Sequence, residues 1–251
     1  MNIVTSGKLN IAVVGAGISG LSAAWLLSQS HNVTLYEKDD RPGGHSNTVD
    51  AGQTPVDTGF IVYNTRCYPN LCALFDHLNV ETTATDMSFA ASMDEGGLEY
   101  GGGDLSALFA QKRNLLRFYR EAPAALEDGT AEHISLGDYL RDKRYSKSFI
   151  NDHLLPMGAA IWSTPVDTMM AYPLAAFVRF CQNHGLLQIK DRPQWRTVVG
   201  GSREYVKRMT AGISGGVVLD RAISKVGKTP SGKAFVEDRY GKREEFDHVV
   251  L

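Results

Sequence analysis

The sequence predicts an α/β fold in which a parallel sheet is interrupted by a mostly helical second domain. Three observations indicate this fold. Residues 9–37 follow the order strand, helix, strand, which is the usual beginning of a parallel sheet. The middle of the chain has mostly helical spacing of its apolar residues, and strand patterns return after residue 195. We therefore expect one α/β domain with a second domain inserted into it.

The individual elements follow from local patterns. Residues 9–14 and 33–37 form short apolar runs typical of buried strands, and residues 18–29 between them form a helix that packs through small residues. Apolar spacing and helix-end signals predict further helices at residues 69–78 and 104–120, within residues 135–185, and from 203 to about 210. Apolar runs between turn residues predict further strands at residues 87–92, 98–100, 217–219, 222–226, 234–238 and 246–251. Residues 94–97 form the predicted turn between the first two of these strands.

The composition is that of an ordinary globular chain, with 43 % apolar and 22 % charged residues. A net charge of −2 argues against a nucleic-acid-binding surface. No apolar run reaches the roughly 18–20 residues of a membrane span. The three cysteines are odd in number and lack C-x-x-C spacing, which favours incidental thiols in a reducing compartment. We expect a cytoplasmic protein, and the sequence leaves its oligomeric state open.

The most informative motif is a glycine-rich turn between the first strand and the first helix. Gly15, Gly17 and Gly20 have the spacing G-x-G-x-x-G, and Glu37 follows at the end of the second strand. Gly15 allows a tight turn, Gly17 lets the backbone approach a pyrophosphate, and Gly20 lets helix and strand pack closely. The helix N-terminus offers unpaired N–H groups to the phosphates, and Glu37 can accept hydrogen bonds from a ribose. The motif predicts a Rossmann-like dinucleotide site.

Glu37 by itself does not choose between NAD and FAD, although a carboxylate disfavours the 2′-phosphate of NADP. The next residues discriminate better. Residues 37–45, which read Glu-Lys-Asp-Asp-Arg-Pro-Gly-Gly-His, resemble the E-x-x-x-R-x-G-G-R signature of the flavin-containing amine oxidase and phytoene desaturase superfamily. In that superfamily the glycine pair passes close to the pyrophosphate. His45 stands where the final arginine is common, which weakens a phosphate clamp at this position.

Further segments resemble the same superfamily in the same order. Residues 56–60 resemble a D-x-G segment near the flavin, and residues 195–202 resemble the Gly-Gly entry through which the chain returns to the cofactor domain. Residues 222–226 resemble the strand whose backbone pairs with the adenine edge. Residues 56–64 and 162–165 resemble a bacterial, amine-oxidase-like branch. Asp57 itself is either a ligand or a local cap.

The resemblance implies FAD as the cofactor. Together with the glycine motif, it implies cofactor contacts from Gly15, Ala16, Gly17, Ile18, Ser19, Gly20, Glu37, Lys38, Arg41, Gly43, Gly44, His45, Gly59, Phe60, Ile61 and Ile223. It also implies an FAD-binding domain at residues 1–65 and 195–251, with a substrate or cap domain at residues 66–194. Members of the superfamily are longer, and the final apolar strand stops without a turn. We therefore expect a chain truncated at its C-terminus.

No catalytic residue or metal site is singled out. The histidines lack metal-ligand spacing; they include His45, His77, His133, His153 and His184. Four aromatic residues either line an apolar substrate cavity or, more commonly for such residues, pack in a core: Tyr63, Trp162, Tyr172 and Phe177. Because a flavin itself carries hydride or electron transfer, such enzymes need no polar catalytic motif.

Three hypotheses follow. The first is an FAD-dependent oxidoreductase that takes hydride from a C–H bond of a small molecule, either an amine or an apolar lipid or polyene chain. The second is a flavin-dependent isomerase or mutase without net redox change. The third is an incomplete, non-catalytic nucleotide-binding module.

Overall fold

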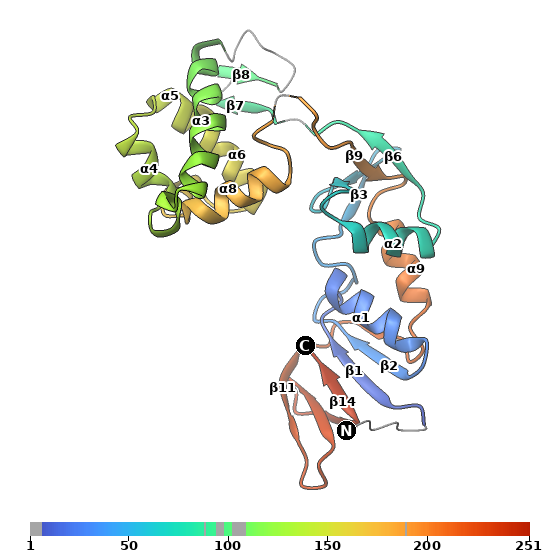
Figure 1. Ribbon diagram of the computed structural model, residues 1–251. Coiled ribbons are helices and arrows are strands. Elements are labelled where there is room, and N and C mark those ends of the chain that lie inside the picture. Colours follow the sequence, from blue (N-terminus) through green and yellow to red (C-terminus); the bar gives the residue numbers. More distant parts are fainter. Residues whose placement is uncertain (1–6, 88, 94–97, 102–108, 189) are drawn as a thin grey trace. The chain divides into compact units, whose positions relative to one another are not determined.

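The computed structural model describes residues 7–87, 89–93, 98–101, 109–188 and 190–251 (Figure 1). The chain divides into two compact units. Unit 1 comprises Met1–Tyr63, Tyr68–Thr85 and Arg196–Leu251, and unit 2 comprises Asn64–Cys67 and Asp86–Trp195.

Unit 1 is built on a four-stranded parallel sheet, which confirms the predicted α/β class. The strand order is β10–β2–β1–β14, with bounds Val217–Val218, Asn32–Tyr36, Asn10–Val14 and His248–Val250. The central strands β1 and β2 are almost continuously apolar and buried, as expected for a parallel sheet covered on both faces. The strands that come from opposite ends of the chain thus form one sheet.

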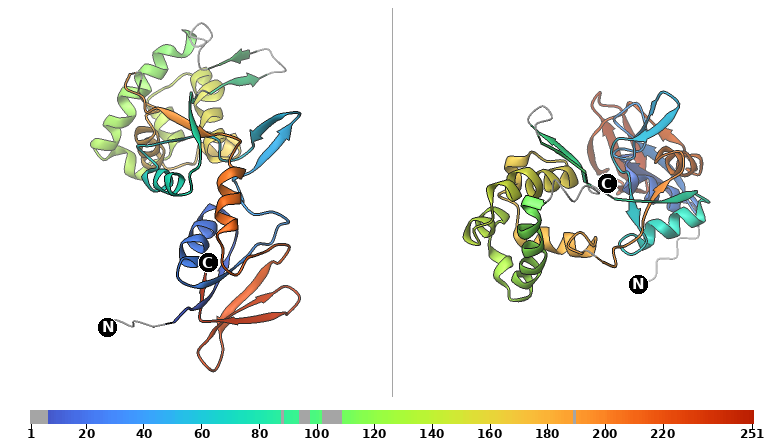
Figure 2. Two further views of the ribbon diagram at one scale, coloured as in Figure 1. Left: turned by 90° about the vertical axis from the view of Figure 1, so that its right-hand side faces the viewer. Right: turned by 90° about the horizontal axis from the view of Figure 1, so that it is seen from above.

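Helices cover one face of this sheet. They are α1 (Ile18–Ser28) and α9 (Arg203–Ala211), which lie side by side, and α2 (Pro69–His77) packs on these two helices through His77 and Phe75 (Figures 1 and 2). Leu21, Leu35 and Met209 are fully buried in the core between them. Burial of each such side chain contributes about 1.5–3 kcal/mol, so this core fixes where the helix N-termini stand relative to the strand ends.

An antiparallel meander covers the other face. It consists of β11 (Ile223–Lys228), β12 (Ala234–Asp238) and β13 (Arg243–Phe246), paired in that order (Figure 2). Tyr36 and Val236 meet in a second core between sheet and meander. The predicted strand at residues 246–251 is wrong in one detail, because Asp247 separates β13 from β14. Its backbone N–H donates to Asn10 O at 2.8 Å, and its Oδ2 accepts from Asn10 N at 2.8 Å.

Two small sheets in and beside unit 1 had no counterpart in the sequence prediction. Strands β3 (Thr48–Ala51) and β4 (Thr54–Asp57) form a hairpin within the turn-rich stretch after the glycine loop. The second sheet has the order β5–β9–β6, with bounds Tyr63–Asn64, Trp195–Val198 and Thr82–Thr85. The hairpin strands are mostly exposed, so they lack the alternating apolar pattern that predicts a strand.

Unit 2 is mostly helical. Its helices are α3 (Phe109–Glu127), the 3₁₀ turn η2 (Thr130–His133), α4 (Leu136–Asp142), α5 (Lys147–Phe149), the π-helical turn η3 (Ile150–Leu154), α6 (Leu155–Trp162), α7 (Val166–Met169) and α8 (Leu174–Asn183). The strands β7 (Ala91–Met93) and β8 (Leu98–Tyr100) form a hairpin. Phe118 lies fully buried at the centre of an aromatic core, in contact with the rings of Tyr145 and Phe177.

One predicted helix of unit 2 is longer in the structure than the sequence indicated. Helix α3 continues past residue 120 and through Pro123, because Ala122 and Ala125 are buried in the core and hold the last turns in place. Residue 88, the predicted turn at 94–97 and the predicted helical residues 104–108 lie outside the described residues. No helix among the described residues is long and apolar enough to cross a membrane.

The division into units differs from the predicted boundaries at 65/66 and 194/195 by one or two residues at each boundary and by one longer segment. Residues 68–85 belong to unit 1 and not to the inserted domain. The reason is that Phe75, on α2, is buried in the helix-side core of unit 1, where it packs against Tyr63 and Tyr205.

Candidate dinucleotide-binding site

The glycine turn between β1 and α1 has the geometry that the motif predicts. Gly15 has φ of 97°, a left-handed value that favours glycine, and its N–H donates to Tyr36 O at 2.7 Å. A Cβ on Gly20 would lie 1.8 Å from Gly15 O, so helix and turn approach too closely for any side chain. A Cβ on Gly15 or Gly17 would meet nothing within 4 Å. The turn is therefore open on the side where a ligand must approach.

Among the described residues, the N-terminus of α1 has no side-chain cap to accept hydrogen bonds from its first N–H groups. Gly17 is the N-cap residue, no side chain caps the helix, and the first turn contains no acidic residue. Ile18 and Ser19 are exposed at this end. The first N–H groups of a helix lack intrahelical partners and carry partial positive charge, so this end of the 11-residue helix suits an anion such as a pyrophosphate.

Glu37 is only 7 % exposed and is bonded to backbone N–H groups. Its Oε2 accepts from Ala16 N at 2.6 Å, and its Oε1 accepts from the N–H of Lys38 at 2.8 Å and of Asp39 at 3.1 Å. A carboxylate has about four acceptor positions, and three are occupied, so one position on Oε2 is left for a ribose hydroxyl. Glu37 fixes the glycine turn as well as offering that acceptor, a role that the spacing did not indicate.

The second glycine pair lies directly on the first turn. Gly43 N donates to Ala16 O at 2.7 Å, and a Cβ on Gly44 would lie 3.2 Å from Gly17 Cα. Both glycines have positive φ, 115° at Gly43 and 57° at Gly44. Arg41 is exposed and donates from Nη2 to Gly44 O at 3.0 Å, so its side chain braces this loop. The Lys38 side chain is exposed, and the Lys38 backbone N–H donates to Glu37 Oε1.

The segment after the hairpin is paired with the same loop. Phe60 N donates to His45 O at 2.9 Å, and a Cβ on Gly59 would lie 2.1 Å from that oxygen. Ile61 is 53 % exposed, and its carbonyl accepts from Thr197 Oγ1 at 2.9 Å. The structure thus brings the predicted residues 43–45 and 59–61 together, and the His45 side chain is exposed.

The return strand reaches the acid. Arg221 N donates to Glu37 O at 2.8 Å and Asp220 N donates to Asp39 O at 3.0 Å, which sets the start of β11 beside the end of β2. Ile223 is half-buried against the meander-side core. Ile223 thus lies two residues after the contact of Arg221 with Glu37, and its contact with the cofactor stays a prediction.

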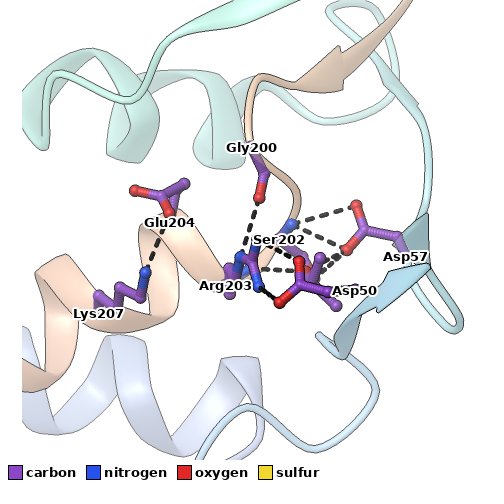
Figure 3. A network of polar contacts seen from close by, with 8 residues as sticks. Asp50, Asp57, Gly200, Ser202, Arg203, Glu204 and Lys207 are labelled. Atoms are coloured by element: carbon purple, nitrogen blue, oxygen red, sulfur yellow. Dashed lines mark hydrogen bonds and ion pairs between the residues drawn. The ribbon is translucent and has the colours of Figure 1, made fainter. Parts of the chain in front are cut away.

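Sequence reasoning missed one polar network in this unit. Asp57 accepts hydrogen bonds from Ser202, at the start of α9, and from Thr48 across the hairpin; Arg203 pairs with Asp50 (Figure 3). Asp57 and Ser202 are 145 residues apart, so no local pattern could reveal the contact. Asp57 does act as a cap, as one of the two alternatives proposed, but it caps a helix that is far away in the sequence and not its own loop.

The aromatic candidates lie in the cores. Tyr63 is 3 % exposed and packs edge-on against Phe75 in unit 1. Trp162, Tyr172 and Phe177 belong to one cluster in unit 2, with ring centroids 4.9 Å apart for Trp162 and Tyr172 and 5.5 Å apart for Trp162 and Phe177. This packing favours the interpretation as core residues over that of cavity-lining residues.

Among the histidines, His153 is the most buried candidate, at 8 % exposed. Burial lowers its pKa below the ordinary value of 6.5, and its Nδ1 lies 3.0 Å from the hydroxyl of Tyr100. Within the described residues, no group of three or more His, Cys, Asp or Glu side chains is placed to hold a metal ion.

An open glycine turn, an uncapped helix and a buried acid at the next strand end define a Rossmann-type dinucleotide-binding unit. In agreement, residues 13–78 match the NAD(P)-binding Rossmann-like domain family. The chain is 27 % identical over 247 residues to the "Putative flavin-containing monoamine oxidase AofH" of Mycobacterium tuberculosis, covering 92 % of this chain and 54 % of that protein. It is also 43 % identical over 51 residues to a phytoene dehydrogenase of Streptomyces griseus, covering 20 % of this chain and 10 % of that protein.

Solved structures show the same fold. Putrescine oxidase bound to putrescine superposes with a TM-score of 0.72 at 21 % identity, covering 98 % of this chain and 58 % of that one. Cyclohexylamine oxidase from Brevibacterium oxydans gives a TM-score of 0.71 at 18 % identity, covering 98 % and 58 %. These similarities confirm the resemblance to the flavin-containing amine oxidase and phytoene desaturase superfamily. The chain spans about half the length of the mycobacterial protein and of these structures.

Proposed function

We propose that this chain carries the FAD-binding unit of an oxidoreductase of the amine oxidase and desaturase type. The observation that carries the proposal is the open space over Gly15 and Gly17 in front of the uncapped helix α1, with Glu37 bonded to the same turn. A dinucleotide needs anion-binding N–H groups and a ribose acceptor at this spacing, and both are present.

Two further observations support FAD over NAD. The loop at Gly43 and Gly44 packs on the first turn, so a second stretch of backbone faces the same approach. The relative that matches most of the chain, and the two oxidase structures, are flavin-containing or amine-oxidising proteins by name. Glu37 disfavours NADP, since its carboxylate would repel a 2′-phosphate.

The proposed roles follow from these positions. The N–H groups of Gly17, Ile18 and Ser19 and the backbone at the exposed Gly44 bind the pyrophosphate, and Oε2 of Glu37 accepts from the ribose. Gly43 holds the Gly44 loop on the first turn through its bond to Ala16 O. The backbone near Ile223 borders the adenine, and residues 59–61 border the flavin. Bound FAD supplies the acceptor for hydride from a substrate C–H bond. The chain's own residues bind and orient the cofactor.

We propose an amine as the substrate class. The similarity to the monoamine oxidase homologue extends over 92 % of this chain, whereas the similarity to the phytoene dehydrogenase is confined to 51 residues. The nucleotide motif alone accounts for a short match of that kind, because it is shared by many flavin enzymes. An apolar carbon chain is the alternative substrate class.

The proposal is tested by the absorbance of the protein expressed from its complete reading frame. We expect a yellow protein whose flavin spectrum bleaches on anaerobic addition of an amine, with hydrogen peroxide released when oxygen is admitted. Colourless protein that cannot be reconstituted with FAD would overturn the proposal. Bleaching by polyenes or lipids but not by amines would move the substrate class, and turnover without any electron acceptor would favour an isomerase.

A further inference from the structure

We propose that Asp57 is a positioning residue for the flavin half of the FAD site. Its carboxylate fastens the β3–β4 hairpin to the N-terminus of α9 and thereby fixes the backbone segment 58–61, which follows the hairpin and borders the flavin in the proposed site. This inference rests on the proposed function and adds to it a residue that does not touch the cofactor in any of the roles assigned above.

Helix α9 does not cap itself. Its N-cap residue Ser202 has helical φ and ψ of −59° and −23°, and its side chain makes no capping bond to the helix. The first N–H groups of a helix need acceptors from elsewhere. Here the hairpin supplies them. Asp57 accepts from Ser202 N, at 2.9 Å on Oδ1 and 3.1 Å on Oδ2, and Thr48 Oγ1 accepts from Arg203 N at 3.0 Å.

The Asp57 carboxylate collects three donors. Besides Ser202 N, its Oδ1 accepts from Ser202 Oγ at 2.7 Å and from Thr48 Oγ1 at 2.5 Å (Figure 3). Ser202 is only 1 % exposed, so these bonds are shielded from water on the helix side. Hydrogen bonds to a charged acceptor are stronger than neutral ones, and a carboxylate at a helix N-terminus also interacts favourably with the helix dipole.

Glycine makes the approach of the two elements close. Gly201 has φ of 86°, and a Cβ at this position would lie 2.5 Å from the Thr48 side chain. The turn before α9 is therefore pressed against the hairpin. This contact gives Gly201 a structural reason that is independent of any direct contact with a ligand.

The hairpin continues into the cofactor loops. Past the Thr48 and Asp57 pair, Thr58 N donates to Asn47 O at 2.9 Å, and Phe60 N donates to His45 O at 2.9 Å. The loop that contains Gly43 to His45 and the segment that contains Gly59 to Ile61 therefore extend the two strands of the hairpin and stay paired with each other. Asp57, at the end of β4, bonds this paired stretch to α9 directly before residues 58–61.

A second contact holds the same arm against α9. Ser46 Oγ lies 2.5 Å from the hydroxyl of Tyr205, both residues are buried, and a Cβ on Gly43 would lie 3.4 Å from the Val206 side chain. With Asp57 released, Ser46 would keep its contact with Tyr205, and the hairpin would keep the bonds of Thr48 and Asp50 to Arg203. We therefore expect residues 58–61, which come directly after Asp57, to be displaced, while the turn at Gly15 to Gly20 and the loop at Gly43 and Gly44, joined by the bond from Gly43 N to Ala16 O, stay in place.

Asp50 provides a matched control on the same hairpin. Its carboxylate also pairs with the start of α9, through Arg203 Nη1 at 2.9 Å and Nη2 at 2.7 Å. The Asp50 side chain is 57 % exposed, however, and it accepts no helix N–H. Exposed ion pairs contribute little, so removal of this carboxylate changes the charge of the hairpin without releasing it from the helix.

The experiment measures the dissociation constants of FAD and of ADP for apoprotein from the complete reading frame, in wild type, Asp57→Asn, Asp50→Asn and Ser202→Ala. We expect Asp57→Asn to weaken the binding of FAD about ten-fold, which corresponds to about 1.4 kcal/mol. The same variant should weaken the binding of ADP less than about two-fold. Asp50→Asn should change neither by more than about two-fold. Ser202→Ala loses only the Oγ donor and should weaken the binding of FAD about three-fold. This variant tests the inference if Asp57→Asn does not fold.

The ratio of the two affinities separates the outcomes. A structural role alone would weaken FAD and ADP equally, and that result, or an unchanged FAD affinity in folded Asp57→Asn and Ser202→Ala, would overturn the inference while the proposed function stands. A wild-type protein that binds ADP but not FAD would instead overturn the proposed function, and the inference with it.

Discussion

At the end of β2, two neighbouring residues belong to the two sides of the parallel sheet and have different surroundings. Tyr36, the last residue of β2, is buried toward the meander, whereas Glu37, the next residue, is bonded to the glycine turn. On the meander side, Tyr36 donates to Glu244 Oε2 at 2.7 Å, and the Arg221 guanidinium pairs with both Glu244 and Asp238. On the turn side, an acid is held by backbone N–H groups alone.

This difference indicates that the meander side stabilises the fold and that the turn side binds the ligand. On the meander side the charges pair with one another, through Arg221 Nε to Asp238 and Nη1 to Glu244, although Arg221 Nη2 is buried without a hydrogen-bond partner among the described residues. On the turn side, no side chain in the described part of the chain caps α1, and three of about four acceptor positions of Glu37 are occupied. A strand whose side chains alternate between faces can thus assign adjacent residues to different tasks. The predictions below test whether stability and FAD affinity divide in the same way.

The largest effect is expected at Gly20. A Cβ there would lie 1.8 Å from a backbone oxygen, so Gly20→Ala forces the helix away from the turn. We expect a loss of about 3 kcal/mol or more in the free energy of unfolding, measured by urea denaturation. Gly17→Ala is the matched control, because its Cβ meets nothing within 4 Å and its φ of −70° suits alanine.

Gly17→Ala should therefore cost less than about 1 kcal/mol of stability while weakening FAD by more than about ten-fold, because the added methyl group occupies the approach to the turn. If Gly17→Ala binds FAD like wild type, the assignment of the open side of the turn to the pyrophosphate is wrong.

The next effect is expected on the meander side. Arg221→Met leaves Asp238 and Glu244 without their shared cation, and Asp238 is only 6 % exposed. Removing one partner of a buried charge cluster costs about 3 kcal/mol. The FAD affinity of the folded fraction should stay within two-fold of wild type, because the bond from Arg221 N to Glu37 O belongs to the backbone. A ten-fold loss of FAD affinity would show that the two faces are coupled.

Glu37→Gln is expected to affect both quantities. The amide that replaces one carboxylate oxygen cannot accept from a backbone N–H, so at least one of the bonds to Ala16, Lys38 and Asp39 is lost. We expect about 2 kcal/mol of destabilisation and at least ten-fold weaker binding of both FAD and ADP. An equal loss of affinity for FAD and ADP would show that Glu37 acts on the ADP portion that the two ligands share. At Asp57, by contrast, we expect only the affinity for FAD to fall.

The sequence was sufficient where the physical reason is local. The turn at Gly15 to Gly20, helix α1 and strand β2 follow from spacing and apolar runs, and the structure has them within a residue or two of their predicted ends. The β3–β4 hairpin could not be predicted in this way, because Val49 and Val56 are paired with each other but are both exposed. Its strands are held by contacts with α9 that lie far away in the sequence.

The candidate site divides in the same manner. The glycines and Glu37 are recognisable because each must be a given residue type at a given spacing. The structural role of Asp57, and the occupation of most of the Glu37 carboxylate by backbone N–H groups, depend on which segments fold together. Neither is encoded in a local pattern, and the resemblance to a family does not supply them either.

The smallest effect is expected at Tyr36 and depends on pH. Burial and the bond to Glu244 raise the pKa of the Tyr36 hydroxyl above its ordinary value of 10.0. At pH 8 the loss of that bond should make Tyr36→Phe about 1 kcal/mol less stable than wild type. As the pH rises above 10, Tyr36 ionises in the unfolded chain but not in the folded one, so wild type loses about 1.4 kcal/mol by pH 11 relative to the variant. The two unfolding free energies should therefore cross between pH 10 and 11, and parallel curves would show that the hydroxyl is not held by the meander side at all.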